Sequence, residues 1–232
     1  MISVAIHQPN FFPWLGYFNK LFLCDVFIFL DDVQFSKTGG TWSNRVKLLV
    51  SGESRWVTAA IDRNYSGERI IREMRFLTKS PWRQKFIKTL EANYRRHPYY
   101  IETMDLVQPL ILNPESNIAV YNMHAVVTIA ENMGVNKNKF YYSSEYKAKG
   151  NSNELLCDLT LKAGGDIYLS GDGAGGYQQE STFENHNIQL EQQNFQHPKY
   201  IQHGREGFVP GLSVIDALMN LGVSGTRQAL KC

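Results

Sequence analysis

The first residues that could do chemistry lie in the turn His7-Gln8-Pro9, directly after the apolar run ISVAI at residues 2–6. That run predicts a buried strand, and open α/β sheets bind ligands outside the carboxyl ends of their strands. An imidazole at this place can serve as a general base or donate a hydrogen bond to a developing oxyanion. The alternative is a histidine that is satisfied by a backbone carbonyl in a turn and has no chemical role.

A second polar group follows the apolar run VFIFL at residues 26–30 and comprises Asp31, Asp32, Gln34 and Lys37. Because parallel strands end at the same edge of a sheet, we expect this group beside the histidine turn. Neighbouring carboxylates on extended backbone face opposite ways, so we expect one to face the site and the other to cap the following turn or to orient a partner. The alternative is a solvated acidic loop. A two-carboxylate magnesium site is a further alternative, but no DxD spacing supports it, and we assign no metal ligand.

The third group, Trp42-Ser43-Asn44-Arg45, opens the next predicted strand. Arg45 could grip a phosphate or carboxylate through two parallel hydrogen bonds, and Asn44 could bind amide or hydroxyl groups. The alternative is a surface arginine at the start of a strand.

Two later segments could also hold a polar ligand. The Gly-rich run from Ser170 to Tyr177 follows a short predicted strand, and its backbone amides could bind an anion. Gly171, Gly173 and Gly176 have GxGxxG spacing, but no acidic ribose ligand follows on a clear strand, so a lid or a simple turn is the alternative. Residues 193–202, QNFQHPKYIQ, are rich in amides and aromatics, which suits sugar hydroxyls, base edges or a polar loop packed on the core.

The elements that must position these residues alternate in type along the chain. Apolar runs predict strands, and helical periodicity predicts helices. The strands are at residues 2–6, 26–30, 140–143, 167–169 and 188–192, and the helices at 13–23, 81–96, 117–134, 152–163, 177–185 and 212–221. Residues 45–50 and 55–61 flank Ser51-Gly52-Glu53, which is a hairpin signature. We therefore predict an α/β fold: a mainly parallel sheet flanked by helices, with a β-hairpin and a helical middle region, in one domain over residues 1–232.

Composition and charge exclude several classes of protein. Hydrophobic residues make up 43% of the 232 residues and charged residues 20%, which allows a sizeable core and excludes wholesale disorder. The net charge of +2 gives no electrostatic basis for a nucleic-acid or membrane partner. Cys24, Cys157 and Cys232 form no CxxC pair, which favours a reducing cytoplasm over a disulfide framework. We find no secretion signal and no apolar stretch of about 18 residues, so we expect no membrane span.

Several of these segments together carry a family resemblance. The stretch HQPNFFPWLGYFNKLFLCDVFIFLDDVQFSK, followed by WSNRVKL, IYLSGDGAGGY, FQHPKYIQ and FVPGLSVIDALMNLG, resembles the WbqC-like proteins of bacterial polysaccharide gene clusters. The resemblance covers nearly the whole chain, in the right order. It implies a role in O-antigen or lipopolysaccharide biosynthesis, and some of these glycans carry acyl or aminoacyl groups on amino sugars.

From this resemblance we expect a cytoplasmic enzyme, a transferase that places an acyl or aminoacyl group on the amine of a dTDP- or UDP-linked amino sugar. Its partners would be that nucleotide sugar and an activated acyl or aminoacyl donor, with no cofactor. We expect His7 to be the base and Asp32 to orient either His7 or the amine. The residues expected to bind substrate are Gln8, Trp14, Tyr17, Gln34, Phe35, Lys37, Asn44, Arg45, Gly171, Tyr177, Tyr200 and Gln202.

Two alternatives stay open, and the sequence does not determine the oligomeric state. One is an ATP-using nucleotidyltransferase or ligase, because the opening of the chain is similar to HIGH-type enzymes such as pantothenate synthetases, although the second histidine of their motif is absent here. The other is a non-catalytic binding or scaffold protein of a glycan assembly complex. Such a protein would use the aromatic face of the predicted helix at residues 13–23 as its interface.

Overall fold

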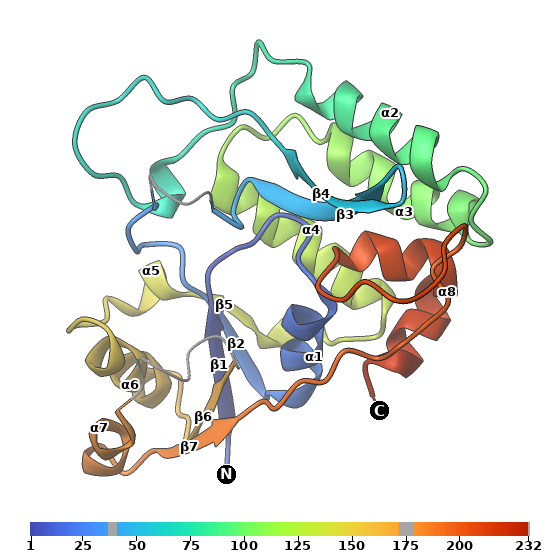
Figure 1. Ribbon diagram of the computed structural model, residues 1–232. Coiled ribbons are helices and arrows are strands. Elements are labelled where there is room, and N and C mark those ends of the chain that lie inside the picture. The colour runs from blue at the N-terminus through green and yellow to red at the C-terminus, as the bar shows by residue number, and fades with distance from the viewer. Residues whose placement is uncertain (37–40, 172–178, 232) are drawn as a thin grey trace.

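The computed structural model describes residues 1–36, 41–171 and 179–231, and its centre is a five-stranded parallel sheet (Figure 1). The strands are β1 (Ser3–His7), β2 (Val26–Phe29), β5 (Phe140–Tyr142), β6 (Ile167–Ser170) and β7 (Gln189–Gln192). Their order across the sheet is β5-β2-β1-β6-β7, and every neighbouring pair is parallel. The chain therefore builds the sheet outward from β1 in both directions.

Helices cover both faces of this sheet, because the side chains of a strand alternate between its faces. Val4 and Ile6 of β1 belong to a hydrophobic cluster with residues of α6 (Asn153–Lys162) and α7 (Glu180–Asn185). Ala5 belongs instead to the larger core that contains α1 (Leu15–Leu23). In Figure 1, α6 and α7 lie on one side of the strands and α1 on the other. The predicted α/β class with a mainly parallel sheet is confirmed.

The predicted hairpin is also confirmed and forms a separate two-stranded sheet of β3 (Arg45–Val50) and β4 (Glu53–Thr58). Ser51 and Gly52 connect the strands with positive φ angles of 53° and 79°. Positive φ at both central residues matches the right-handed twist of a tight antiparallel pair. The alternating burial of β3 directs Val46 and Leu48 into the core, while β4 is largely exposed.

The helical middle region lies beside and behind the hairpin in the view of Figure 1. It contains η1 (Ile71–Glu73), α2 (Trp82–Tyr94), α3 (Tyr100–Leu112) and α4 (Ile118–Asn132), and the short η2 (Lys137–Lys139) and α5 (Ser143–Tyr146) flank β5. The sequence patterns predict no helix over the α3 segment, which contains Pro109 in its interior. The last helix, α8 (Val214–Ala229), is longer than predicted because it continues past a kink at Gly222 (φ 69°). No helix among the described residues is long and apolar enough to cross a membrane.

Candidate functional site

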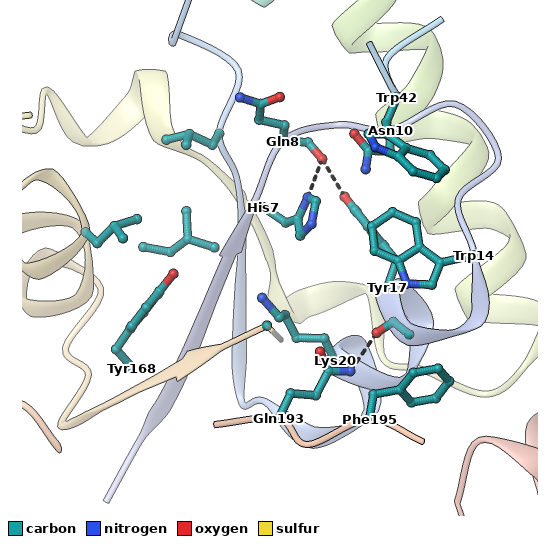
Figure 2. A pocket seen from close by; sticks show the side chains of 15 residues that line it. His7, Gln8, Asn10, Trp14, Tyr17, Lys20, Trp42, Tyr168, Gln193 and Phe195 are labelled. Carbon is teal, nitrogen blue, oxygen red and sulfur yellow. Dashed lines mark hydrogen bonds between the residues drawn. The ribbon is translucent and has the colours of Figure 1, made fainter. Parts of the chain in front are cut away.

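A pocket of about 440 Å³ lies at the carboxyl ends of β1 and β6 (Figure 2). Its polar lining includes His7 and Gln8 from the end of β1, Lys20 from α1, and Gln193 beyond β7. These two strands are the point where the sheet order reverses, since β2 and β5 extend one way from β1 and β6 and β7 the other. Parallel sheets leave an open crevice at such a point, where the connections diverge to opposite faces. The topology thus creates the pocket in which His7 lies.

His7 is held as a neutral imidazole with one defined tautomer. Its Nδ1 lies 3.1 Å from the carbonyl oxygen of Gln8, which can only accept, so Nδ1 carries the proton and Nε2 is left as an acceptor. The Tyr17 hydroxyl donates to the same carbonyl over 3.0 Å, and its ring lies 4.6 Å from the imidazole. Burial and the nearby Lys20 charge lower the pKa of His7 to about 3, against the weaker opposing effect of the Gln8 carbonyl.

Lys20 brings a buried positive charge to the pocket. Its side chain leaves α1 and points into the cavity near His7 (Figure 2), with a relative exposure of only 3%. Its Nζ lies 3.0 Å from the place that a β-carbon on Gly171 would occupy, so the ammonium and the backbone after β6 adjoin. Lys20 was not among the site residues that we predicted. The signal for it was a lysine three residues after Tyr17, on the apolar face of a short helix.

Aromatic rings form one wall of the pocket. The indoles of Trp14 and Trp42 lie 5.0 Å apart, and Trp42 continues to Trp56 of the hairpin at 4.8 Å. Gly16 is required beneath this wall, because a β-carbon there would lie 2.7 Å from the Trp14 ring and 2.8 Å from Phe195. Trp42 lines the pocket but was not in our substrate-binding set, although it lies two residues before Asn44, which was.

Amide groups complete the lining. Gln193 donates from Nε2 to the carbonyl of Gly16 at 2.7 Å and to Oδ1 of Asn19 at 2.8 Å, which fixes it against α1 (Figure 2). Gln8 and Asn10 contribute further amide side chains. The pocket therefore combines a neutral imidazole, a buried cation, amide donors and acceptors, and flat aromatic surfaces, which suits a polar ligand with an anionic group and a ring.

A buried asparagine on α4 joins the two loops that carry the aromatic wall. Nδ2 of Asn122, which is fully buried, donates to the carbonyls of Pro9 at 2.9 Å and Ser43 at 2.7 Å. The Phe11 amide also donates to the carbonyl of Trp42 at 2.8 Å. These bonds explain how Trp42 comes to lie over the histidine turn, far from it in the sequence.

The start of α8 clamps the same turn from its other side. The Ser213 hydroxyl donates to the carbonyl of Phe12 at 2.7 Å, and the Val214 amide donates to that of Pro13 at 2.8 Å. Phe12 is fully buried with a positive φ of 43°, a conformation that is costly for a residue with a side chain. The motif LSV near the end of the chain thus supports the motif NFFPW near its start.

Of the predicted site residues, His7, Gln8, Trp14, Tyr17 and Gly171 line this pocket. Lys37 and Tyr177 lie outside the described residues. The remaining seven lie elsewhere, and each has a partner or an environment that accounts for its position.

Asp32 follows β2 at the predicted edge of the sheet, but it faces away from His7. The Ser143 hydroxyl lies within hydrogen-bond distance of both Asp32 and Asp31, and the Ser144 amide and hydroxyl donate to Asp31 at 3.1 and 2.9 Å. Because β2 lies between β1 and β5, its carboxylates can meet the start of α5 instead of the pocket. The Gln8 carbonyl, not Asp32, orients His7.

The predicted site residues in and before the hairpin form contacts with their immediate surroundings and not with the pocket. Gln34 is exposed beside Ile70, and Phe35 is buried in the core. Asn44 donates to the carbonyl of Ala59 at 2.9 Å, and the Arg45 guanidinium stacks 4.0 Å above the Trp56 ring. None of these four side chains lines the pocket.

Tyr200 and Gln202 do not line the pocket; they donate hydrogen bonds to a buried carboxylate on α8. The Tyr200 hydroxyl and the Gln202 amide donate to Oδ1 of Asp216 at 2.7 and 3.1 Å, and the Tyr94 hydroxyl donates to Oδ2 at 3.1 Å. Burial raises the pKa of Asp216, while these three donors oppose the rise. This network ties the segment before α8 to α2 and is structural.

The burial of α1 bears on the scaffold alternative, and the acidic and cysteine side chains show what other chemistry the described residues hold. The aromatic face of α1 is buried, with Tyr17 and Phe18 at 1% and 0% exposure, so it is not available as the interface that the scaffold hypothesis required. Among the described residues, no group of three His, Cys, Asp or Glu side chains is arranged to hold a metal ion. Burial raises the pKa of the Cys24 and Cys157 thiols to about 11, which keeps both thiols protonated.

Comparison with known proteins gives one family and one relative. The model of the WbqC-like protein family matches residues 8–228 of the chain. The chain is 28% identical over 233 aligned residues to Rv1507c of Mycobacterium tuberculosis, described as an uncharacterized protein, with 100% of this chain and 99% of that protein covered. No solved structure matches the chain.

Proposed function

The chain belongs to the WbqC-like protein family, and from that premise we propose that it transfers an acyl or aminoacyl group to the amine of a nucleotide-linked amino sugar in surface-polysaccharide biosynthesis. One observation carries the proposal. A neutral histidine with a free Nε2 and a buried lysine share a pocket that is walled by tryptophans at the switch point of a parallel sheet. Aromatic faces suit a nucleobase or a sugar ring, and the lysine suits a diphosphate.

The reaction would join the sugar nitrogen to the activated carbonyl carbon, and the bond to the donor's leaving group would break. The attacking amine must lose a proton, and His7, which lines the pocket, has Nε2 left as an acceptor. With a pKa near 3, His7 is a weak base in the empty pocket. Since the Lys20 charge is one cause of that low pKa, a diphosphate bound beside Lys20 would offset the charge and strengthen the base.

The test is an amide-formation assay that uses a panel of dTDP- and UDP-linked amino sugars with coenzyme A thioesters and activated aminoacyl donors. Mass spectrometry would detect the N-acylated sugar. We expect His7→Ala to lower the rate by about 10²- to 10⁴-fold, the usual effect of losing an acid–base group. His124→Ala, which removes an exposed histidine from α4, is the matched control and should keep the full rate.

Equal rates for the two alanine variants would remove His7 from the reaction. If no member of the panel were acylated or raised the melting temperature of the protein, the proposed substrate class would be wrong.

A second candidate, ATP-dependent ligation or nucleotidyl transfer, has one observation in its favour. The ammonium of Lys20 adjoins Gly171 at the end of β6, where a nucleotide phosphate could meet both the charge and the backbone. This reaction would release pyrophosphate from ATP. Product formation without ATP in the acylation assay would exclude it.

A further inference from the structure

A second pocket, of about 580 Å³, lies where the hairpin turn, the end of α2 and the segment before α8 meet. It shares no lining residue with the pocket that contains His7. Its charged and titratable side chains are Glu91, Arg95, Arg96, His97, His203 and Arg205. Three arginines against one glutamate leave a charge of +2 when both histidines are neutral.

The three arginines form no close ion pair with a described carboxylate, although Arg205 lies near enough to the buried Asp216 for its charge to oppose the rise in the pKa of that carboxyl. Among the described residues, no ion pair involves Arg95, Arg96 or Arg205. Arg205 is anchored by two backbone carbonyls, since Nη1 donates to Gly52 and Nε to Glu206, each at 3.2 Å. A guanidinium has five N–H donors, so three of its donors stay outside these two bonds.

A buried histidine adds a second, independent sign of a ligand. His97 is 9% exposed, and neither of its ring nitrogens forms a hydrogen bond with a described residue. Buried polar groups without a protein partner are rare in native proteins, and such a group is typical of a site that binds a water molecule or a ligand. The centres of the His203 and Tyr94 rings lie 5.1 and 4.7 Å from the centre of the His97 ring.

The histidine pair would respond to an anion. Burial and the neighbouring His203 lower the pKa of His97 to about 4. The backbone of Tyr94 opposes this shift in part, although it lies too far out of line to form a hydrogen bond with the His97 ring. A bound anion favours protonation and so raises that pKa. A protonated imidazole has two N–H donors to offer.

We propose that this second pocket binds the phosphate or diphosphate group of a small ligand. Arginine forks match tetrahedral phosphate oxygens, and a charge of +2 matches a dianion better than the single charge of a carboxylate. The volume lies in the usual range of about 300–1,000 Å³ for small-molecule sites. A polynucleotide fits less well, because the basic residues line a concavity and do not form an extended stripe.

The test is a titration of the full chain with inorganic phosphate, inorganic pyrophosphate and UDP, followed by NMR of the histidine rings. We expect saturable shifts of His97 and His203 and a higher pKa of His97 in the bound state. Arg96→Ala should weaken pyrophosphate binding by about 10- to 100-fold, the usual effect of losing a charge-assisted bidentate partner. Arg63→Ala, an exposed arginine outside both pockets, is the control for net charge and should bind like the unaltered protein.

Three results would overturn the proposal. The first is the absence of saturable histidine shifts up to about 5 mM pyrophosphate, well into the millimolar range of weak binding. The second is equal weakening of pyrophosphate binding by Arg96→Ala and Arg63→Ala. The third is loss of the histidine shifts in Lys20→Met, which would place the anion in the first pocket. Tighter binding of UDP than of pyrophosphate would uphold the proposal with a nucleotide as the source of the phosphate, and equal binding would uphold it with the diphosphate alone.

Discussion

The neutral state of His7 predicts how the stability of the protein depends on pH. The imidazole has a pKa of about 3 in the folded protein against 6.5 in a solvated side chain, so acid protonates the unfolded chain first. Its contribution to stability is therefore fully present above pH 6.5 and is lost as the pH falls toward 3. The linkage relation gives a loss of about 2.7 kcal/mol between pH 8 and pH 4.5. Because part of the ring faces the open pocket, screening reduces this to about 2 kcal/mol.

The perturbation that isolates this effect is His7→Gln. The carbonyl of Gln8 loses the imidazole donor in this variant but keeps the Tyr17 hydroxyl, so the turn retains a hydrogen bond. Urea unfolding at pH 8 and pH 4.5 measures the free energy of unfolding of both proteins. We expect the unaltered protein to lose about 2 kcal/mol more than His7→Gln on acidification. Carboxylates that titrate in this range are common to both proteins and cancel.

The control is His124→Gln, which removes an exposed histidine from α4 and should follow the unaltered protein. NMR of the imidazole would give the pKa of His7 directly. If the unaltered protein and His7→Gln lost stability in parallel, within about 0.5 kcal/mol, the folded protein would bind the proton at His7. The assignment of a neutral ring with a free Nε2 would then be refuted, and with it the explanation of how substrate binding strengthens the base.

Two further substitutions test what positions the site. Asn122→Ala leaves two buried carbonyls without their donor and should lower the free energy of unfolding, measured by urea titration, by about 2–3 kcal/mol. The control Asn132→Ala, at the exposed end of the same helix, should lower it by less than about 0.5 kcal/mol. Equal losses would contradict the role of Asn122 as the link between the two loops. Gly165→Ala would place a β-carbon 2.3 Å from the Val4 side chain of β1, and we expect calorimetry to show a free energy of unfolding lower by about 1–3 kcal/mol. An unchanged melting temperature would show that β1 and the end of α6 have more room than the structure indicates.

The sequence alone determined the elements and one edge of the site. Short-range patterns encode strands, the hairpin turn and most helices, because side-chain periodicity and turn geometry are local properties. The position of His7 at the end of an apolar strand was enough to place it at the edge of the sheet where the pocket lies. Helix α3 was missed because its interior proline is unfavourable in a helix and only tertiary packing offsets that cost.

Only the tertiary structure decided which polar residues share the pocket with His7. Because β2 pairs with β5, Asp32 contacts Ser143 at the start of α5 and not His7. The packing of α1 against the sheet buries Lys20 beside Gly171. Gln193 donates a hydrogen bond to Gly16 of α1, a residue 177 positions earlier in the sequence. Strand order and the meeting of distant segments depend on how whole faces bury together, and this long-range packing leaves no local pattern in the sequence.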